Sequence, residues 1–362
     1  MAEKLQDNAR LKINLGMFQP AKGFFMLLII QCHNFGILGK HPHFSVQTLQ
    51  TNPVLGLALF ILDFFFFNTL IPCFFMICGY SIRRRPLRYL IKGTPLYLLK
   101  AYLITSVICI CLNTLKAIVR GYDVSEYFIT ECLSFILMPQ LKMEFLGHTA
   151  YGISAIWFVY VLAIDSILLN QILALKSRWS QAAVCVLLAV IGMALRQYNV
   201  PFFILQSCIC CSFMYIGHLI SQYKLLTKKI PLVFVVLPLL FWVFLFVRCN
   251  FYVDIYANFY SDGMVDLIAI WLLGYHMLYA AAYLGQRSGK LIDFLSWMGQ
   301  YSFVLCCIHH VENRVLLWKE AVAFVTQNLT IQFFAALILR ICLCLALTYA
   351  FVQFEKKKRL CT

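Results

Sequence analysis

Long apolar runs are the feature that most limits what this sequence can fold into. Most of them are close to the length of about 20 residues that a helix needs to cross a hydrocarbon core of about 30 Å. Such a segment is helical because a helix satisfies its own backbone hydrogen bonds without water. The sequence therefore predicts an all-α, polytopic membrane protein. Ten spans are expected, at 22–39, 55–80, 95–118, 153–170, 181–195, 202–221, 231–247, 264–284, 294–311 and 331–352.

The composition and the distribution of charge support this fold class. Of the 362 residues, 62% are hydrophobic and 12% are charged, whereas about 25% are charged in an average soluble protein. The net charge of +15 does not indicate a nucleic-acid partner, because the basic residues gather in alternate loops, where they face anionic lipid. With both termini in the cytoplasm, the inner loops contain most of the 30 Lys and Arg residues, following the positive-inside rule. We therefore expect a multi-pass protein of the inner (cytoplasmic) membrane with cytoplasmic termini.

The connections between the spans leave no room for a separate soluble domain. We expect one integral membrane domain over residues 1–362, with short cytoplasmic tails at about 1–21 and 353–362. Most of the 16 cysteines fall within the expected spans, where cysteine acts as a small hydrophobic residue, so no metal site is predicted. The external segment 248–263 mixes Tyr, Phe, Asn and Asp. This mixture suits either contact with a sugar or an aromatic belt at the membrane surface.

Ionisable side chains within a span mark either a function or a buried pair, because they are costly to insert. Arg340 and Asp165 are both expected near mid-depth, and we predict that they pair. Asp63 and Asn68, in the second span, are candidates to orient an imidazole.

Lys22 and His33 occupy the first span and are 11 residues apart. At about 100° per residue, 11 residues make about three turns plus 20°, so both side chains lie on one helix face. Their separation along the axis is about 16 Å, or about half the hydrocarbon thickness. Lys22 is therefore expected at the inner surface and His33 near the midplane. The spacing alone fits equally well a lysine that reaches the surface and a histidine that only bonds a neighbouring helix.

Four stretches of the sequence together resemble the acyltransferase family 3 of integral membrane acyltransferases. The family begins with a basic residue, usually Arg, followed by Gly and then by a histidine in the first span. Lys22, Gly23 and His33 reproduce that spacing, with Lys in place of Arg. The stretch "IPCFFMICGYSI" is similar to the family segment Pro-x-Phe-Phe-x-x-Ser-Gly, although Cys78 occupies the serine position.

The other two stretches, and a basic loop, follow in the family's order. The loop "RRRPLRYLIKG" resembles the family's basic inner loop. The stretch "AIWFVYVLA" is similar to a span that begins with Trp and Phe, and "MGQYSFVLCCIHH" is similar to a Gly-x-x-Ser pattern followed by a histidine. The matching residues are Arg85, Arg88 and Lys92 in the loop, Trp157 and Phe158 in the span, and Gly299, Ser302 and His309 in the last stretch.

The resemblance implies transfer of an acyl group, most often acetyl, from cytoplasmic acyl-coenzyme A to a hydroxyl of a cell-surface or lipid-linked glycan. Acetyl-coenzyme A is then a co-substrate, and no permanently bound cofactor is expected. The predicted donor-binding residues are Lys22, Arg85, Arg88 and Lys92, which suit phosphate groups. His33 is the predicted catalytic residue, either as general base or as a transient acyl carrier. Candidates on the acceptor side are His309, Trp157 and Ser302.

Two alternatives come from other functional classes. A transporter or flippase of a small molecule or of a lipid-linked glycan would also be rich in spans, with polar groups at the midplane. A non-catalytic relative is the other alternative, because two residues depart from the family pattern, Lys22 in place of Arg and Cys78 in place of Ser. The expected partners are acyl-coenzyme A, the glycan, membrane lipid, and either a second copy of the chain or glycan-synthesis machinery.

Overall fold

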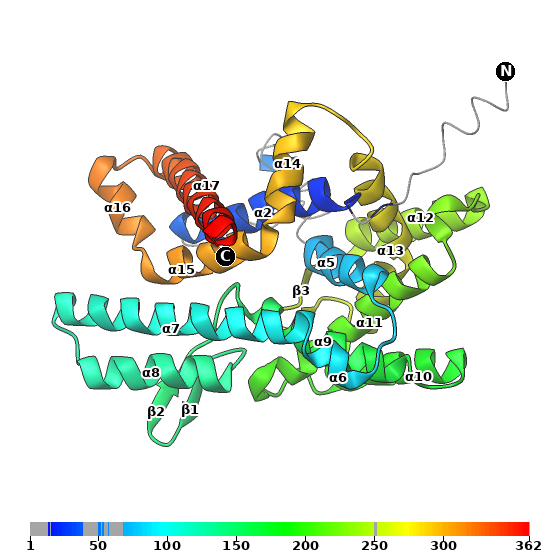
Figure 1. The fold of residues 1–362 in the computed structure, drawn as a ribbon, viewed down its shortest axis with the longest axis horizontal. Helices are drawn as coiled ribbons and strands as arrows, with labels where there is room; N and C mark the ends of the chain where they lie inside the picture. Colours follow the sequence, from blue (N-terminus) through cyan, green and yellow to red (C-terminus); the bar gives the residue numbers. More distant parts are fainter. Residues whose placement is uncertain are drawn as a thin grey trace.

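The computed structural model describes residues 14, 16–38, 50, 51, 53, 57, 68–249 and 252–361. Apart from two short antiparallel hairpins, the described elements are helices (Figure 1). The hairpins pair β1 (Met143–Phe145) with β2 (His148–Ala150) and β3 (Val253–Asp254) with β4 (Phe259–Tyr260). The helices before the first hairpin are α2 (Gln19–Asn34), η1 (Phe35–Leu38), α5 (Asn68–Ser81), α6 (Leu87–Ile91), α7 (Thr94–Arg120) and α8 (Val124–Leu137). The later helices are α9 (Trp157–Ile172), α10 (Arg178–Ala194), η3 (Pro201–Phe203), α11 (Ile204–Gln222), η4 (Leu225–Thr227), α12 (Leu232–Cys249), α13 (Met264–Leu284), α14 (Lys290–Gln300), α15 (Ser302–Val315), α16 (Trp318–Val325) and α17 (Leu329–Cys361).

Four stretches of the described chain are long and apolar enough to cross a membrane. They are Leu87–Arg120, Pro201–Gln222, Met264–Leu284 and Ile331–Lys357. Shorter apolar helices occur at Asn68–Ser81, Trp157–Ile172, Arg178–Ala194 and Leu232–Arg248, so the chain is a helical membrane protein. Each of these eight stretches overlaps an expected span. Asp63, which belongs to the second expected span, lies outside the described residues.

The ninth expected span, 294–311, is not one straight helix. The chain bends by 73° between α14 and α15, so this pair forms either a broken span or a re-entrant loop. The bend has a packing cause, because α14 lies across α2 while α15 runs on towards α7 and α17 (Figure 1). A single helix could not make both sets of contacts.

Glycines permit the crossing of α2 and α14. A Cβ atom at Gly23 would overlap the carbonyl oxygen of Leu295, and a Cβ atom at Gly299 would overlap the carbonyl oxygen of Gln19. Small residues at such positions let two helix backbones approach closely within a membrane. Gly23 and Gly299 belong to the first and the last of the four stretches in the sequence, so the fold brings these two stretches together.

The helices α7 and α8 form an antiparallel pair at one edge of the molecule (Figure 1). Gly121 ends α7 with φ +70°, a left-handed conformation that glycine adopts without steric cost. Asp123 then caps α8, because its side chain accepts a hydrogen bond from the backbone N–H of Glu126 at 3.0 Å. This turn sends α8 back along α7 and brings Glu131 to the side of α15.

Candidate functional site

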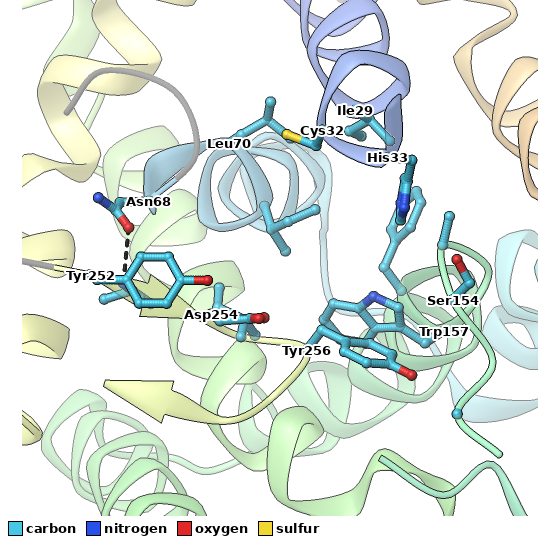
Figure 2. Close-up of a pocket in the computed structure, with 16 residues that line it drawn as sticks. Ile29, Cys32, His33, Asn68, Leu70, Ser154, Trp157, Tyr252, Asp254 and Tyr256 are labelled. Atoms are coloured by element: carbon cyan, nitrogen blue, oxygen red, sulfur yellow. Dashed lines mark hydrogen bonds between the residues drawn. The ribbon is translucent and has the colours of Figure 1, made fainter. Parts of the chain in front are cut away.

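A cavity of about 480 Å³ lies between α2, the start of α5, the start of α9 and the β3–β4 hairpin. Its wall is mixed in character, with aromatic rings, a carboxyl, a hydroxyl and an imidazole (Figure 2). The polar and aromatic side chains in this wall include His33, Ser154, Trp157, Tyr252, Asp254 and Tyr256. Apolar walls with a few polar groups are typical of small-molecule sites.

His33 lies in the last turn of α2 and is partly exposed to this cavity. Helix α2 is unbroken from Lys22 to His33, which confirms the helical spacing on which the prediction depended. Figure 2 shows the imidazole extending from α2 towards the ring of Trp157. Trp157 begins α9, and its ring packs 5.4 Å from that of Phe203 and 5.9 Å from that of Tyr256, measured between centroids. These two ring contacts hold the indole in place on the side of the cavity towards which the imidazole extends.

The β3–β4 hairpin closes the other side of the cavity and is tied down by amide side chains. Asn68 accepts a hydrogen bond from the backbone N–H of Val253 at 2.9 Å (Figure 2). The side-chain amide of Gln206 donates to the carbonyl oxygen of Tyr256 at 3.0 Å. Burial raises the pKa of Tyr256 to about 12, so its phenol stays protonated at neutral pH and can donate a hydrogen bond. The hairpin thus presents Tyr252, Asp254 and Tyr256 to the cavity in fixed positions.

His309 lies behind His33 and not in the wall of the cavity. The centroids of the two imidazole rings are 5.1 Å apart, with an angle of 48° between the rings. His309 is fully buried, and its Nδ1 lies 2.6 Å from Oε1 of Glu312, three residues later on α15. The two histidines that the sequence singles out on α2 and α15 are therefore neighbours.

Glu312 is the centre of a buried polar network. The Nε atom of Arg340 lies 3.2 Å from both of its carboxylate oxygens, and the indole N–H of Trp318 also donates to it. Arg340, which is 2% exposed, donates in addition to the side-chain oxygen of Asn313. The amide nitrogen of Asn313 donates to the hydroxyl of Ser154 at 3.1 Å, so the network reaches the cavity wall.

The predicted pair of Arg340 with Asp165 is wrong. Arg340 bonds Glu312, whereas Asp165 accepts a hydrogen bond from Ser207 of α11. The reason is the helix arrangement: α17 packs on α15 and α2, while α9 packs on α11 and α7. Equal depth in the membrane does not make two residues neighbours.

His309, Glu312 and Cys344 are close enough together to hold a metal ion. One potential ligand atom from each lies within 4.8 Å of the other two, and all three residues are buried. Arg340 already supplies a positive charge to the Glu312 carboxylate. A metal cation would have to compete with that guanidinium for the Glu312 carboxylate.

The predicted donor-binding residues lie at the opposite end of α2 from His33. Lys22, in the first turn of α2, is partly buried. The ring of Phe18 packs 5.2 Å from that of Tyr80, between centroids, which places the start of α2 beside the end of α5. The basic loop that follows α5 is exposed at Arg85, Arg88 and Lys92.

Two further placements complete the set of predicted residues. Asn170 of α9 holds the backbone of Arg85, accepting from its N–H at 2.8 Å and donating to its carbonyl at 3.0 Å. Ser302 is the first residue of α15, at the bend after α14, and it does not line the cavity.

Sequence reasoning missed the network around Glu312 and the residue Ser154. A signal for Glu312 was present, since a glutamate three residues after a histidine lies on the same helix face. Ser154 has φ +28°, a left-handed conformation that is uncommon for a residue other than glycine. Nothing in the sequence around it indicates this conformation, because it follows from the contacts of the segment before α9.

The fold and the cavity define a class of protein, namely a helical membrane protein with an imidazole at the wall of an internal site. The family model described as an acyltransferase domain matches residues 21–349, and the chain belongs to this family, the acyltransferase family 3. The match spans all the helices from α2 to most of α17, including both histidines. No curated protein and no solved structure matches the chain significantly.

Proposed function

We propose that the chain transfers an acyl group, acetyl in the simplest case, from cytoplasmic acyl-coenzyme A to a hydroxyl of a cell-surface or lipid-linked glycan. The observation that carries the proposal is the position of His33, which lies at the wall of the cavity and 11 residues along one continuous helix from Lys22. The acyltransferase family supplies the class of reaction.

The proposed donor lies along α2. Its phosphates bind Lys22 and the exposed loop residues Arg85, Arg88 and Lys92, because guanidinium and ammonium groups bind phosphate strongly. Its extended thiol arm spans the distance of about 16 Å to His33. In this arrangement the charged end stays at the surface while the thioester enters the cavity.

The proposed acceptor lies between Trp157 and the hairpin. An aromatic ring packs well against the apolar face of a sugar, while Asp254 and Tyr256 offer a hydrogen-bond acceptor and a protonated donor for its hydroxyls. Of the two alternatives for segment 248–263, we therefore propose the contact with a sugar. Ser154, held by Asn313 at 3.1 Å, is a further hydroxyl in the same wall.

Two routes for the reaction are proposed, and both return His33 to its starting state. As a general base, His33 removes the proton from the acceptor hydroxyl while the oxygen attacks the thioester carbonyl. The carbon–sulfur bond breaks, and the leaving thiolate takes the proton back. As a carrier, one ring nitrogen of His33 attacks the thioester, the carbon–sulfur bond breaks, and the leaving thiolate takes the proton of the other ring nitrogen. The hydroxyl then attacks the acyl-imidazole, the carbon–nitrogen bond breaks, and the hydroxyl proton returns to the ring.

We also propose ten crossings with both termini in the cytoplasm. The four spans, the four shorter apolar helices, α2 and the bent pair α14–α15 supply the required segments. Topology reporters fused after Arg88, Lys229 and Lys358 should read cytoplasmic, and a fusion near Asn258 should read external. An external reading after Arg88 would separate the basic loop from cytoplasmic donor.

The test of the proposed function replaces His33 by Gln and by Ala in cells that otherwise lack the gene. Their membranes are supplied with radiolabelled acetyl-coenzyme A, and label in membrane glycan is measured. Gln keeps a hydrogen bond but takes no proton at neutral pH, so both variants should lose at least about 100-fold in rate. His276→Gln is the matched control, since His276 bonds the carbonyl oxygen of Val235 at 2.8 Å and does not line the cavity. Substantial transfer by His33→Gln, or none by the unaltered protein, would refute the proposal.

A further inference from the structure

His309 has one ring nitrogen bound and the other without a partner. Nδ1 is 2.6 Å from the Glu312 carboxylate, whereas Nε2 is buried and has no hydrogen-bond partner within the described part of the chain. A buried polar atom without a partner is costly and calls for an explanation. The neighbour that this imidazole packs against is His33, with the ring centroids 5.1 Å apart.

The contact with Glu312 determines which nitrogen of His309 carries the hydrogen. A carboxylate accepts hydrogen bonds, so Nδ1 must donate and therefore bears the proton of the neutral ring. Nε2 is then a bare lone pair that can accept a proton. Arg340 and Trp318 both donate to the Glu312 carboxylate.

We propose that His309 is a positioning residue for His33 and holds its second proton during acyl transfer. The inference rests on the proposed function, in its general-base route. As one nitrogen of His33 takes the proton of the acceptor hydroxyl, the other gives its proton to Nε2 of His309. The imidazolium thus formed on His309 is stabilised by the Glu312 carboxylate. When the thiolate leaves, the protons move back in the reverse order, and no proton is gained or lost.

The charged and titratable groups around His309 come from three helices. His33 faces it from α2, Glu312 belongs to its own helix, and Arg340 and Cys344 face it from α17. On the far side, Arg314 is paired with Glu131 by two contacts of 3.0 Å. The carboxylate and the guanidinium beside His309 balance each other, so the imidazole can become charged without a second unbalanced positive charge nearby.

The first variant is His309→Gln, which keeps a polar side chain of similar size but takes no proton. We expect the turnover number with acetyl-coenzyme A to fall by about 100-fold or more, while the KM for acetyl-coenzyme A changes by less than about twofold. The matched control is His310→Gln. His310 is equally buried on the same helix, but its ring packs edge-on against Phe135, with centroids 6.0 Å apart, instead of against His33. This control should keep its turnover.

The second variant is Glu312→Gln, together with the double variant Glu312→Gln/Arg340→Gln. The single change leaves Arg340 unbalanced beside His309, so protonation becomes harder and the acid limb of the turnover profile should move to lower pH. The double variant leaves no unpaired buried charge, which protects the fold. Its turnover should still be reduced at least tenfold, because no carboxylate then stabilises the imidazolium.

The possible results separate this inference from the proposed function. An inactive His33→Gln with a His309→Gln that keeps more than about a tenth of the normal turnover would refute the relay and leave the acyltransferase intact. An active His33→Gln would refute both. A raised KM with normal turnover in His309→Gln would make His309 a binding residue. Loss of activity on treatment with a chelator, reversed by zinc, would assign His309, Glu312 and Cys344 to a metal and overturn the relay.

Discussion

The two ends of α2 are built in different ways. At its N-terminal end, Gly23 lets the helix backbone touch α14, and the packing of Phe18 on Tyr80 places this end beside the end of α5, which the exposed basic loop follows. No cavity wall fixes the side chains of Arg88 and Lys92 within the described residues, since both are exposed. At the other end, His33 faces a cavity whose wall is held by aromatic packing and by hydrogen bonds of 2.9–3.1 Å.

The difference suits the two kinds of chemistry that we propose for the two ends. Binding of a multiply charged donor depends on the number and sign of charges, and exposed charges do this without a fixed geometry. Bond making requires groups held within a fraction of an ångström of the right position. The Lys22 end of α2 should therefore tolerate conservative changes, whereas the His33 end should not.

The largest effect is expected where the backbones of α2 and α14 touch. In Gly299→Leu the new side chain would overlap the carbonyl oxygen of Gln19, so α2 and α14 must separate. Overpacking usually costs about 1–3 kcal/mol, and a clash with the backbone of another helix should cost more than this range. We expect little folded protein after extraction in mild detergent, measured by size-exclusion yield. Gln300→Leu, one residue later and exposed, should extract normally.

The next largest effect concerns the ion pair that supports the cavity end. Arg314 bonds Glu131 twice at 3.0 Å and also donates to the carbonyl of Gly152 at 3.2 Å, in the cavity wall. Removing one partner of a buried pair costs about 3–5 kcal/mol. Glu131→Ala should therefore lower the melting temperature by roughly 5 °C or more. The exposed pair of Lys142 with Glu144 is the contrast, and Glu144→Ala should leave the melting temperature unchanged.

A similar loss of stability in both variants would contradict the view that the cavity end is the fixed part of the molecule. The measurement is a thermal unfolding curve in detergent, at two salt concentrations. Salt should weaken the exposed pair and leave the buried pair almost unaffected.

The sequence predicted the features of this fold that are local. The spans corresponding to α7, α11, α13 and α17 follow from long apolar runs alone, and the shared helix of Lys22 and His33 follows from helical periodicity. The bend at Tyr301 could not be predicted, because its cause is the contact of Gly299 with a helix nearly 280 positions earlier in the chain. Local periodicity continues through the bend without interruption.

The residues of the candidate site divide in the same way, into those with a local sequence signal and those that depend on helix packing. His33 stands out because an imidazole is unusual in an apolar run, and His309 because of the motif in which it lies. Depth alone predicts Asp165 as the partner of Arg340, because Glu312 lies one residue beyond the expected span 294–311. The choice depends on which helices pack together, and α17 packs on α15.

A smaller effect is expected from the basic loop that follows α5. The double variant Arg85→Ala/Arg88→Ala should raise the KM for acetyl-coenzyme A at least tenfold, because two charge-assisted contacts of about 1.5–3 kcal/mol each are lost. Turnover at saturating donor should stay within about twofold. The double variant Lys228→Ala/Lys229→Ala removes two exposed charges from another loop and should leave the KM unchanged. Equal KM values in both double variants would mean that the arginines contribute to topology and not to donor binding.

The smallest effect, and the finest test of the comparison, is expected at Lys22. Lys22→Arg keeps the charge and adds the forked donor geometry that suits phosphate, so the KM for acetyl-coenzyme A should change by less than about twofold. Lys22→Ala loses one contact and should raise the KM by about three- to tenfold, with turnover nearly normal because His33 is untouched. If Lys22→Ala instead lowers turnover and leaves the KM unchanged, the two ends of α2 are not separable, and Lys22 acts on the position of His33 through the helix that they share.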